Sequence, residues 1–325
     1  MRKIIVVPGK CLVAGLFIIM ASIPLRAQIY VGGPLSENTT WTNNGNYYIV
    51  VENVIVPSGI TLTIEPGVNI LFELNTSLQV KGTLVASGNL ADTITFRPEG
   101  DSWGGIYFNG SRTVVDEEGN YVSGSILSYA RIENSAYSVV LQENAGVLVQ
   151  NSLLKGASFG FYIKDATWNI VRNCVIEGHD FGVFLASSFR AYQNLFQDNV
   201  VNNNRYVGFF VNNSSGLIHH NTITGNRISG NLVGLYLGND GPVDQGFNLV
   251  TGNIFRDNSF GIRLFQDTSL IERNYIINNQ ITGIEIIGAG HSTIRHNLIA
   301  GSGLWGIAVE QNAQFNHFES NSIEY

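Results

Sequence analysis

Apolar and polar residues alternate in short triplets that recur along the chain from residue 160 onward. Both outer positions of every triplet are apolar, whereas the middle position admits Arg263 and Glu285. Alternation with a period of two predicts a β-strand with one buried face. A glycine precedes each triplet, at Gly160, Gly182, Gly208, Gly234, Gly261, Gly283 and Gly306.

An asparagine before an apolar pair recurs with a similar period of about 22 residues. The set is Asn151, Asn173, Asn194, Asn221, Asn253, Asn274, Asn297 and Asn321. Each repeat has room for roughly three short strands, which bury their apolar side chains only when the repeats stack. In a parallel stack, equivalent residues lie about 4.8 Å apart. We therefore expect these amides to form a hydrogen-bonded ladder that runs from coil to coil.

The segment from Asn274 to Ile286 resembles the right-handed parallel β-helix repeat of the pectin-lyase-like superfamily. The resemblance covers residues 130–325, and residues 62–88 and 103–108 are similar to the first coils of exported bacterial β-helix proteins. It implies an all-β solenoid of roughly ten coils over residues 28–325, in which residues 28–60 supply entry strands or an N-terminal cap. The sequence stops partway through a coil, so we expect either a missing C-terminal region or an end-on contact with a partner.

Residues 1–27 have the composition of a secretory signal peptide. Arg2, Lys3 and Lys10 precede or flank the start of an apolar run at residues 11–25, and Ala27 offers a small residue at the cleavage point. The run is shorter than the roughly 20 apolar residues that span a bilayer, and no other segment is long enough. We expect cleavage after Ala27 and a location outside the cytoplasm, in the periplasm, at the cell surface or in the medium.

Removal of this segment changes the charge and the cysteine content. Residues 28–325 contain 14 Lys and Arg against 25 Asp and Glu, a net charge of −11. Nucleic acids and anionic membranes are poor partners for such a chain. Cys174 is then the only cysteine, so packing and not an internal disulfide must hold the fold together.

The resemblance also implies carbohydrate chemistry, because many proteins of the superfamily act on polysaccharides. However, the sequence lacks the Asp-Asp and Gly-His-Gly motifs of polygalacturonases and the signature motifs of pectate lyases and alginate epimerases. The tripeptide Gly178-His179-Asp180 is only loosely similar to the Gly-His-Gly motif. Since a fold alone does not fix an activity, the first expectation is a non-catalytic protein that binds a neutral polysaccharide or serves as a surface adhesive.

A polysaccharide-degrading enzyme is the alternative. Asp240, Asp244 and Asp267 fall near one another by repeat counting, with Arg263 close by. Two carboxyl groups about 5–5.5 Å or about 6.5–9.5 Å apart would suit glycoside hydrolysis, and three would suit Ca²⁺. A simpler interpretation is that these acids are turn residues and that Arg263 pairs with Glu285 across strands. The histidines are too scattered to predict a metal site.

Aromatic residues occupy the middle triplet position in four consecutive repeats, at Tyr162, Phe184, Phe210 and Tyr236. Outward strand positions are usually polar, so an apolar patch here is of the kind that often marks a binding site. Rings in a row suit the apolar faces of pyranose sugars, which makes these four residues the candidate binding site. Stacking of the rings for stability alone is the other interpretation.

Overall fold

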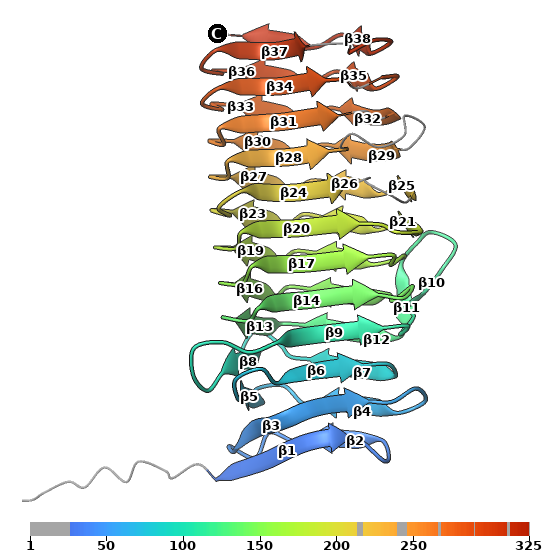
Figure 1. The fold of residues 1–325 in the computed structure, drawn as a ribbon, viewed down its shortest axis with the longest axis vertical. Coiled ribbons are helices and arrows are strands. Elements are labelled where there is room, and N and C mark those ends of the chain that lie inside the picture. Colours follow the sequence, from blue (N-terminus) through green and yellow to red (C-terminus); the bar gives the residue numbers. More distant parts are fainter. Residues whose placement is uncertain are drawn as a thin grey trace, which may run out of the picture.

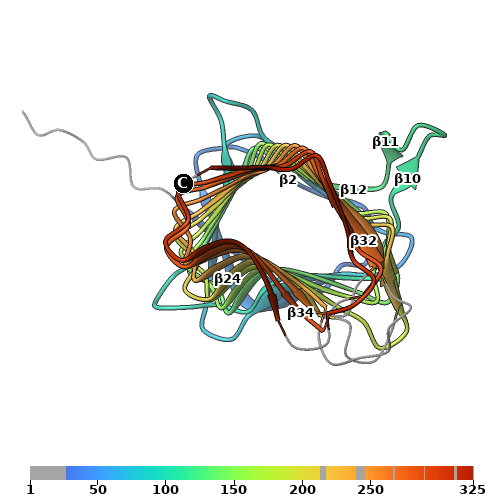
Figure 2. The same cartoon turned by 90° about the horizontal axis from the view of Figure 1, so that it is seen from above.

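The chain winds into a parallel β-helix, as the sequence predicts (Figure 1). The computed structural model describes residues 27–212, 217–238, 246–265, 268–288, 290–310 and 313–324. Each coil adds one short strand to each of three rows, and the coils superimpose when viewed along the axis (Figure 2). The described residues contain no helix, and therefore no helix that could cross a membrane.

The first row has twelve strands, which gives about twelve turns against the roughly ten expected. Its strands are β2 (Thr39–Trp41), β4 (Thr61–Ile64), β7 (Thr83–Ser87), β12 (Ser125–Ser128), β15 (Val147–Gln150), β18 (Ile170–Arg172), β22 (Leu195–Gln197), β26 (Thr222–Thr224), β29 (Gly246–Thr251), β32 (Thr268–Glu272), β35 (Thr293–Arg295) and β38 (His317–Glu319).

The second row follows the first after a tight corner in each coil. Its strands are β5 (Asn69–Phe72), β8 (Ile94–Pro98), β13 (Ala130–Glu133), β16 (Leu153–Lys155), β19 (Val175–Glu177), β23 (Val200–Asn202), β27 (Arg227–Ser229), β30 (Ile254–Arg256), β33 (Tyr275–Ile277), β36 (Leu298–Ala300) and β39 (Ser322–Glu324).

The third row carries the predicted triplets. Its strands are β6 (Ser77–Val80), β9 (Gly105–Asn109), β14 (Tyr137–Gln142), β17 (Phe159–Lys164), β20 (Phe181–Ala186), β24 (Val207–Asn212), β28 (Val233–Leu237), β31 (Phe260–Phe265), β34 (Thr282–Ile287) and β37 (Trp305–Glu310). At the N-terminal end, β1 (Gln28–Pro34) pairs with β3 (Tyr47–Val56), and β3 pairs with both β5 and β6, so it joins the second and third rows.

Two small pairs lie outside the three rows. The strands β21 (Arg190–Tyr192) and β25 (Leu217–His219) are parallel. The strands β10 (Val114–Val115) and β11 (Tyr121–Ser123) form an antiparallel hairpin, which stands out from the solenoid beside β12 (Figure 2).

The alternating side chains fill the interior of the solenoid. Outer triplet residues such as Phe161, Leu235 and Ile284 are at most 1% exposed. Glycine precedes the triplet because the coils approach closely there: a Cβ on Gly208 would lie 2.7 Å from the carbonyl oxygen of Gly234. In the last described coil, which has a neighbour on one side only, Val309 is 53% exposed. Stacking, and not the single coil, therefore buries the core.

Three asparagine ladders, not one, run along the corners between the rows. The first ladder is Asn169, Asn194, Asn221 and Asn248. The second is Asn199, Asn226, Asn253, Asn274, Asn297 and Asn321. The third is Asn204, Asn231, Asn258 and Asn279.

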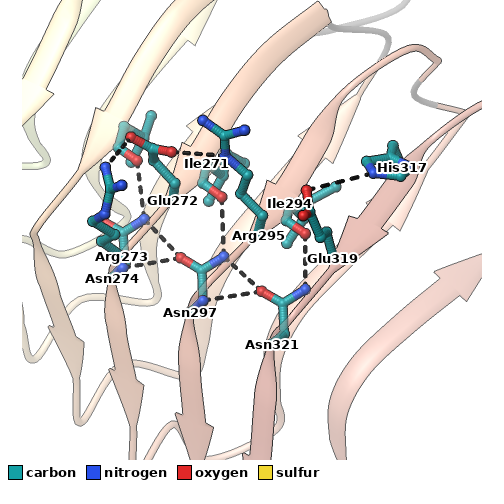
Figure 3. Close-up of polar contacts among 11 residues, drawn as sticks. Ile271, Glu272, Arg273, Asn274, Ile294, Arg295, Asn297, His317, Glu319 and Asn321 are labelled. Atoms are coloured by element: carbon teal, nitrogen blue, oxygen red, sulfur yellow. Dashed lines mark hydrogen bonds and ion pairs between the residues drawn. The ribbon is translucent and has the colours of Figure 1, made fainter.

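Figure 3 shows the end of the second ladder. The backbone N–H and the Nδ2 of Asn274 both donate to Oδ1 of Asn297, each at 3.0 Å, and Nδ2 also donates to the Val250 carbonyl at 3.0 Å. Each buried amide therefore satisfies the backbone at a corner as well as the next amide.

A column of charged residues lies beside the same ladder (Figure 3). Glu272 pairs with Arg273 at 2.7 Å and with Arg295 on the next coil at 2.8 Å, and Arg295 is aligned in turn with Glu319. The Glu272 side chain is only 9% exposed. Because one buried carboxylate serves two guanidinium groups, this column links neighbouring coils across the outer surface of the first row.

The prediction of a single ladder was wrong for Asn151 and Asn173. Both have a positive φ, of 51° and 53°, and their backbone N–H groups donate to carbonyls of the next coil. Asp198, the residue directly before Asn199, makes the same backbone hydrogen bond. Asn151 and Asn173 are turn residues one position before the second ladder. In those two coils Ser152 and Cys174 hold the ladder position. The prediction also merged two corners, because Asn194 and Asn221 belong to the first ladder and the other four to the second.

Candidate functional site

The four predicted aromatic residues lie on neighbouring strands of the third row, and each is half-buried. The register pairs Tyr162 with Phe184, Phe184 with Phe210, and Phe210 with Tyr236. Their ring centroids are 5.6, 5.0 and 4.8 Å apart; the first pair is stacked and the other two meet edge to face. The structure therefore brings all four together on the outer surface.

A second row of rings, which the triplet pattern missed, lies directly beside them. Tyr137, Phe159 and Phe181 begin β14, β17 and β20, and their rings are stacked with centroids 5.3 Å apart at both steps. Phe159 meets Tyr162 and Phe184 edge to face at 5.4 Å. The available signal was the aromatic residue immediately before the recurrent glycine, as in Phe159-Gly160 and Phe181-Gly182.

We call these seven rings the aromatic face: Tyr137, Phe159, Tyr162, Phe181, Phe184, Phe210 and Tyr236. Edge-to-face and offset pairs contribute about 0.5–1.5 kcal/mol each beyond the burial of their area. The rings therefore hold one another in place, and because they are only half-buried, part of each remains on the surface. Such an array is both rigid and available for contact.

Charged residues continue the outward column beyond Tyr236. Arg263 is aligned with Tyr236 on one side and with Glu285 on the other. Its guanidinium forms an ion pair with Glu285, whose side chain is 10% exposed, and lies 4.6 Å from the centroid of the Phe260 ring. The expected pairing of Arg263 with Glu285 is therefore present. The other three candidate catalytic residues, Asp240, Asp244 and Asp267, lie outside the described residues.

An open groove of about 680 Å³ runs beside the rings of Tyr137, Phe159 and Phe181. Its polar lining includes Ser158, Asp180, Asn203 and Arg205. Small residues such as Ala136 and Gly156 form the rest of its lining and leave the groove open. The Nη1 of Arg205 lies 3.9 Å from the Oδ1 of Asp180. Both side chains are exposed, so this ion pair is weak. These groups offer hydrogen-bond donors and acceptors next to an apolar surface.

His179 also lines this groove, but it is a buried structural residue. Ala157 N–H donates to its Nδ1 at 3.0 Å, and its Nε2 lies 3.1 Å from the Leu154 carbonyl, which fits the neutral Nε2–H tautomer. Burial lowers the pKa of His179 to about 4. His179 occupies the third-ladder position, because its own N–H donates to Oδ1 of Asn204. His179 of the Gly178-His179-Asp180 tripeptide is therefore a structural residue of the solenoid.

The sequence matches the family described as periplasmic copper-binding protein (NosD), over residues 89–282 and 218–325. These two matches together span more than half of the chain. The chain belongs to the NosD family. The matched residues include the repeats from Gly160 onward and the whole aromatic face.

Solved structures are similar to this chain at low sequence identity. The periplasmic alginate epimerase AlgG is 12% identical, with 85% of this chain and 78% of that chain covered and a TM-score of 0.54. The AlgE6 A-module, a mannuronan C-5 epimerase from Azotobacter vinelandii, is 13% identical over 92% of this chain and 91% of that chain, with a TM-score of 0.41. No curated protein sequence matches the chain.

The described residues do not fit the copper centre that the family description implies. They contain no group of three or more His, Cys, Asp or Glu side chains able to hold a metal ion. His219 and His220 form a pair, with their Nδ1 atoms 2.6 Å apart, but this supplies two ligands only. Burial raises the pKa of the Cys174 thiol to about 12, which disfavours the thiolate that binds metals. Both methionines, Met1 and Met20, precede the described residues.

Proposed function

We propose that this NosD-family chain is a non-catalytic, extracytoplasmic protein that binds a neutral polysaccharide on its aromatic face. The observation that carries the proposal is the double row of half-buried rings on consecutive coils of a rigid sheet. Sugar rings present apolar C–H faces that pack on aromatic rings, and a surface apolar patch of this extent is typical of a binding site.

The dimensions suit a chain of sugars. Tyr162 and Tyr236 are separated by three rungs of the stack, which is about 14 Å. That length would engage several sugar units at once. The adjoining groove would supply hydrogen bonds to hydroxyl groups from Ser158, Asp180 and Asn203. Ligand sites commonly combine an apolar surface with a few polar groups in this way.

Two further considerations support the ligand class. The similar fold of AlgG, an alginate epimerase by its name, supports a polysaccharide as a fold-level analogy. The net charge of −11 for residues 28–325 disfavours polyuronates, and so the proposal specifies a neutral glycan.

The location rests on two features. The family description is periplasmic, and residues 1–27 have the order of a signal peptide. N-terminal sequencing of protein from the exported fraction should begin at Gln28. Recovery of exported protein that still begins at Met1 would refute cleavage at this point.

Binding is tested by titrating the folded chain with neutral hexasaccharides of glucose, xylose and mannose. In the double variant Phe184→Ser/Phe210→Ser, two contacts between a ring and a sugar are lost, and each is taken to equal an aromatic pair, at about 0.5–1.5 kcal/mol. Affinity should fall about five- to 150-fold. Because no charge pairing is involved, the parent affinity should change little between low and high salt.

The matched control is Val175→Ser/Val200→Ser, two half-buried residues that are paired on adjacent strands of the neighbouring row. This variant should bind as the parent does. The variant Phe184→Leu/Phe210→Leu keeps apolar bulk and removes the rings; it should fold and bind weakly. Parent-like binding by folded Leu variants would refute the proposal, as would binding to none of the oligosaccharides. Release of reducing ends would favour the enzymatic alternative based on Asp240, Asp244 and Asp267.

A further inference from the structure

A hairpin insertion covers one corner of the solenoid, away from the aromatic face. The coil from Phe108 to Leu141 is considerably longer than the next coil, from Leu141 to Ile163. The additional residues form the β10–β11 hairpin, which projects beside β12 (Figure 2). In solenoid proteins, insertions of this kind are often placed on the binding face.

The hairpin is a fixed structure at both its base and its tip. At the base, the Ser111 and Ser125 hydroxyl groups are 2.7 Å apart and buried, and Gly146 N–H donates to the Ser111 carbonyl at 2.6 Å. At the tip, the Nδ2 of Asn120 donates to the Asp116 carboxylate at 3.0 Å, and the Asn120 backbone N–H donates to it at 2.7 Å. These two hydrogen bonds, the side-chain bond first, lower the pKa of Asp116. The base therefore joins the hairpin to the solenoid, and the tip bonds fix the turn of the hairpin itself.

Two small cavities lie between the hairpin and the corner, and both are lined by Trp168, which is 37% exposed. The smaller, of about 170 Å³, is also lined by Arg112, Thr113, Asn144, Thr167 and Tyr192. The larger, of about 280 Å³, is lined on its polar side by Glu118, Gln193 and His220. Both volumes fall below the roughly 300–1,000 Å³ typical of pockets for drug-sized ligands.

Thr113 provides an independent indication of a ligand. Its Oγ1 is buried, yet among the described residues it has no hydrogen-bond partner. Buried hydroxyl groups in native proteins are almost always paired, with protein or with bound molecules. Thr113 lines the smaller cavity together with an indole, a phenol and an amide, and this lining is matched by a ligand that has both an apolar face and hydroxyl groups.

We propose that this corner is a second carbohydrate site, which takes a single pyranose unit against the Trp168 ring. The two cavities are too small for an oligosaccharide, so the corner would hold a terminal unit or a branch. The hydroxyl of Thr113 and the amide of Asn144 would position the sugar, and Tyr192 would close the smaller cavity. The site is independent of the aromatic face, because its residues come from the hairpin and from the segments that follow the third-row strands.

The test is a fluorescence titration with methyl β-glucoside and methyl β-galactoside at millimolar concentration. Trp41 and Trp103 are buried, at 3% and 1% exposure, so a change in emission reports on Trp168 or on exposed Trp305. The variant Trp305→Phe should keep the response. Trp168→Asn, which suits the left-handed backbone of this position (φ 58°), should abolish binding measured by calorimetry.

Thr113→Val keeps the shape of the side chain and removes the hydroxyl. It should weaken binding of the glycoside about three- to tenfold, the value of one hydrogen bond. The Phe184→Ser/Phe210→Ser variant should bind the monosaccharide as the parent does, and Trp168→Asn should still bind the hexasaccharide. If the aromatic face does not bind a glycan, the hexasaccharide titration alone would show it, and the monosaccharide titration would be unaffected. Absence of a response to either glycoside, or parent-like affinity in folded Trp168→Asn, would overturn the corner site.

Discussion

Replacement of His179 by asparagine should change how the stability of this protein depends on pH. His179 is 2% exposed and occupies the first position of a column in which Asn204, Asn231 and the later coils carry asparagine. In the variant, Oδ1 would accept the Ala157 N–H that His179 Nδ1 now accepts, and Nδ2 would donate to the Leu154 carbonyl in place of Nε2. The hydrogen bonds of the corner are therefore retained, and only the titratable ring is lost.

The magnitude follows from the native pKa of about 4, against 6.5 for an ordinary histidine. Burial causes the decrease, and hydrogen bonds with Leu154 and Ala157 and the charges of Glu177 and Asp180 oppose it. As the pH falls, the unfolded chain takes up a proton on His179 at a higher pH than the folded chain does, and this uptake favours unfolding. The contribution of His179 to the free energy of unfolding is therefore fully present above pH 6.5 and is lost as the pH falls toward 4. The parent should lose about 2 kcal/mol by pH 5 and about 3 kcal/mol by pH 4 from this residue.

The assay is urea unfolding of parent and His179→Asn at pH 7.5, 5 and 4. At pH 7.5 the variant should be slightly less stable, because asparagine fills less of the space. At lower pH the difference should move in favour of the variant by about 2–3 kcal/mol. Acid titration of the carboxylates that do not interact with His179 affects both proteins alike and cancels in the difference. Parallel stability curves for the two proteins would refute the assignment of His179 as a neutral buried ladder residue.

Three variants and one labelling reaction test the architecture. Asn274→Ala, in mid-ladder, should cost about 1–3 kcal/mol in unfolding free energy, and Asn321→Ala at the end of the same ladder should cost less; equal costs would contradict the ladder. Gly208→Ala should lower the melting temperature strongly, because its Cβ would lie 2.7 Å from a backbone oxygen, and an unchanged value would show that the coils can separate. Cys174, whose pKa burial raises to about 12, should react with a thiol reagent only after unfolding, so rapid labelling of native protein would show that its coil opens.

Much of the fold could be predicted from the sequence because its main determinants are local. The alternation in triplets such as Phe161-Tyr162-Ile163 specifies a strand with one buried face, and the glycine before it permits close stacking. The same alternation places Tyr162, Phe184, Phe210 and Tyr236 outward, and the structure has them there. A strand period of two is independent of what the rest of the chain does, so it can be recognised in a single repeat.

Only the tertiary structure decided which residues face one another across the coils. Coil lengths vary, as between the coil from Phe108 to Leu141 and the shorter one that follows it to Ile163, so equal spacing along the sequence does not mean an equal position on the solenoid. For that reason Asn173 and Asn194 fell into one column on the sequence, although one is a turn residue and the other a ladder amide. A recurrence of asparagine at five-residue steps, as in Asn194, Asn199 and Asn204, marks three successive corners, but its meaning depends on the strand register. The second row of rings and the corner under the hairpin depend in the same way on hydrogen-bonded pairing between coils, which brings together residues that no local pattern connects.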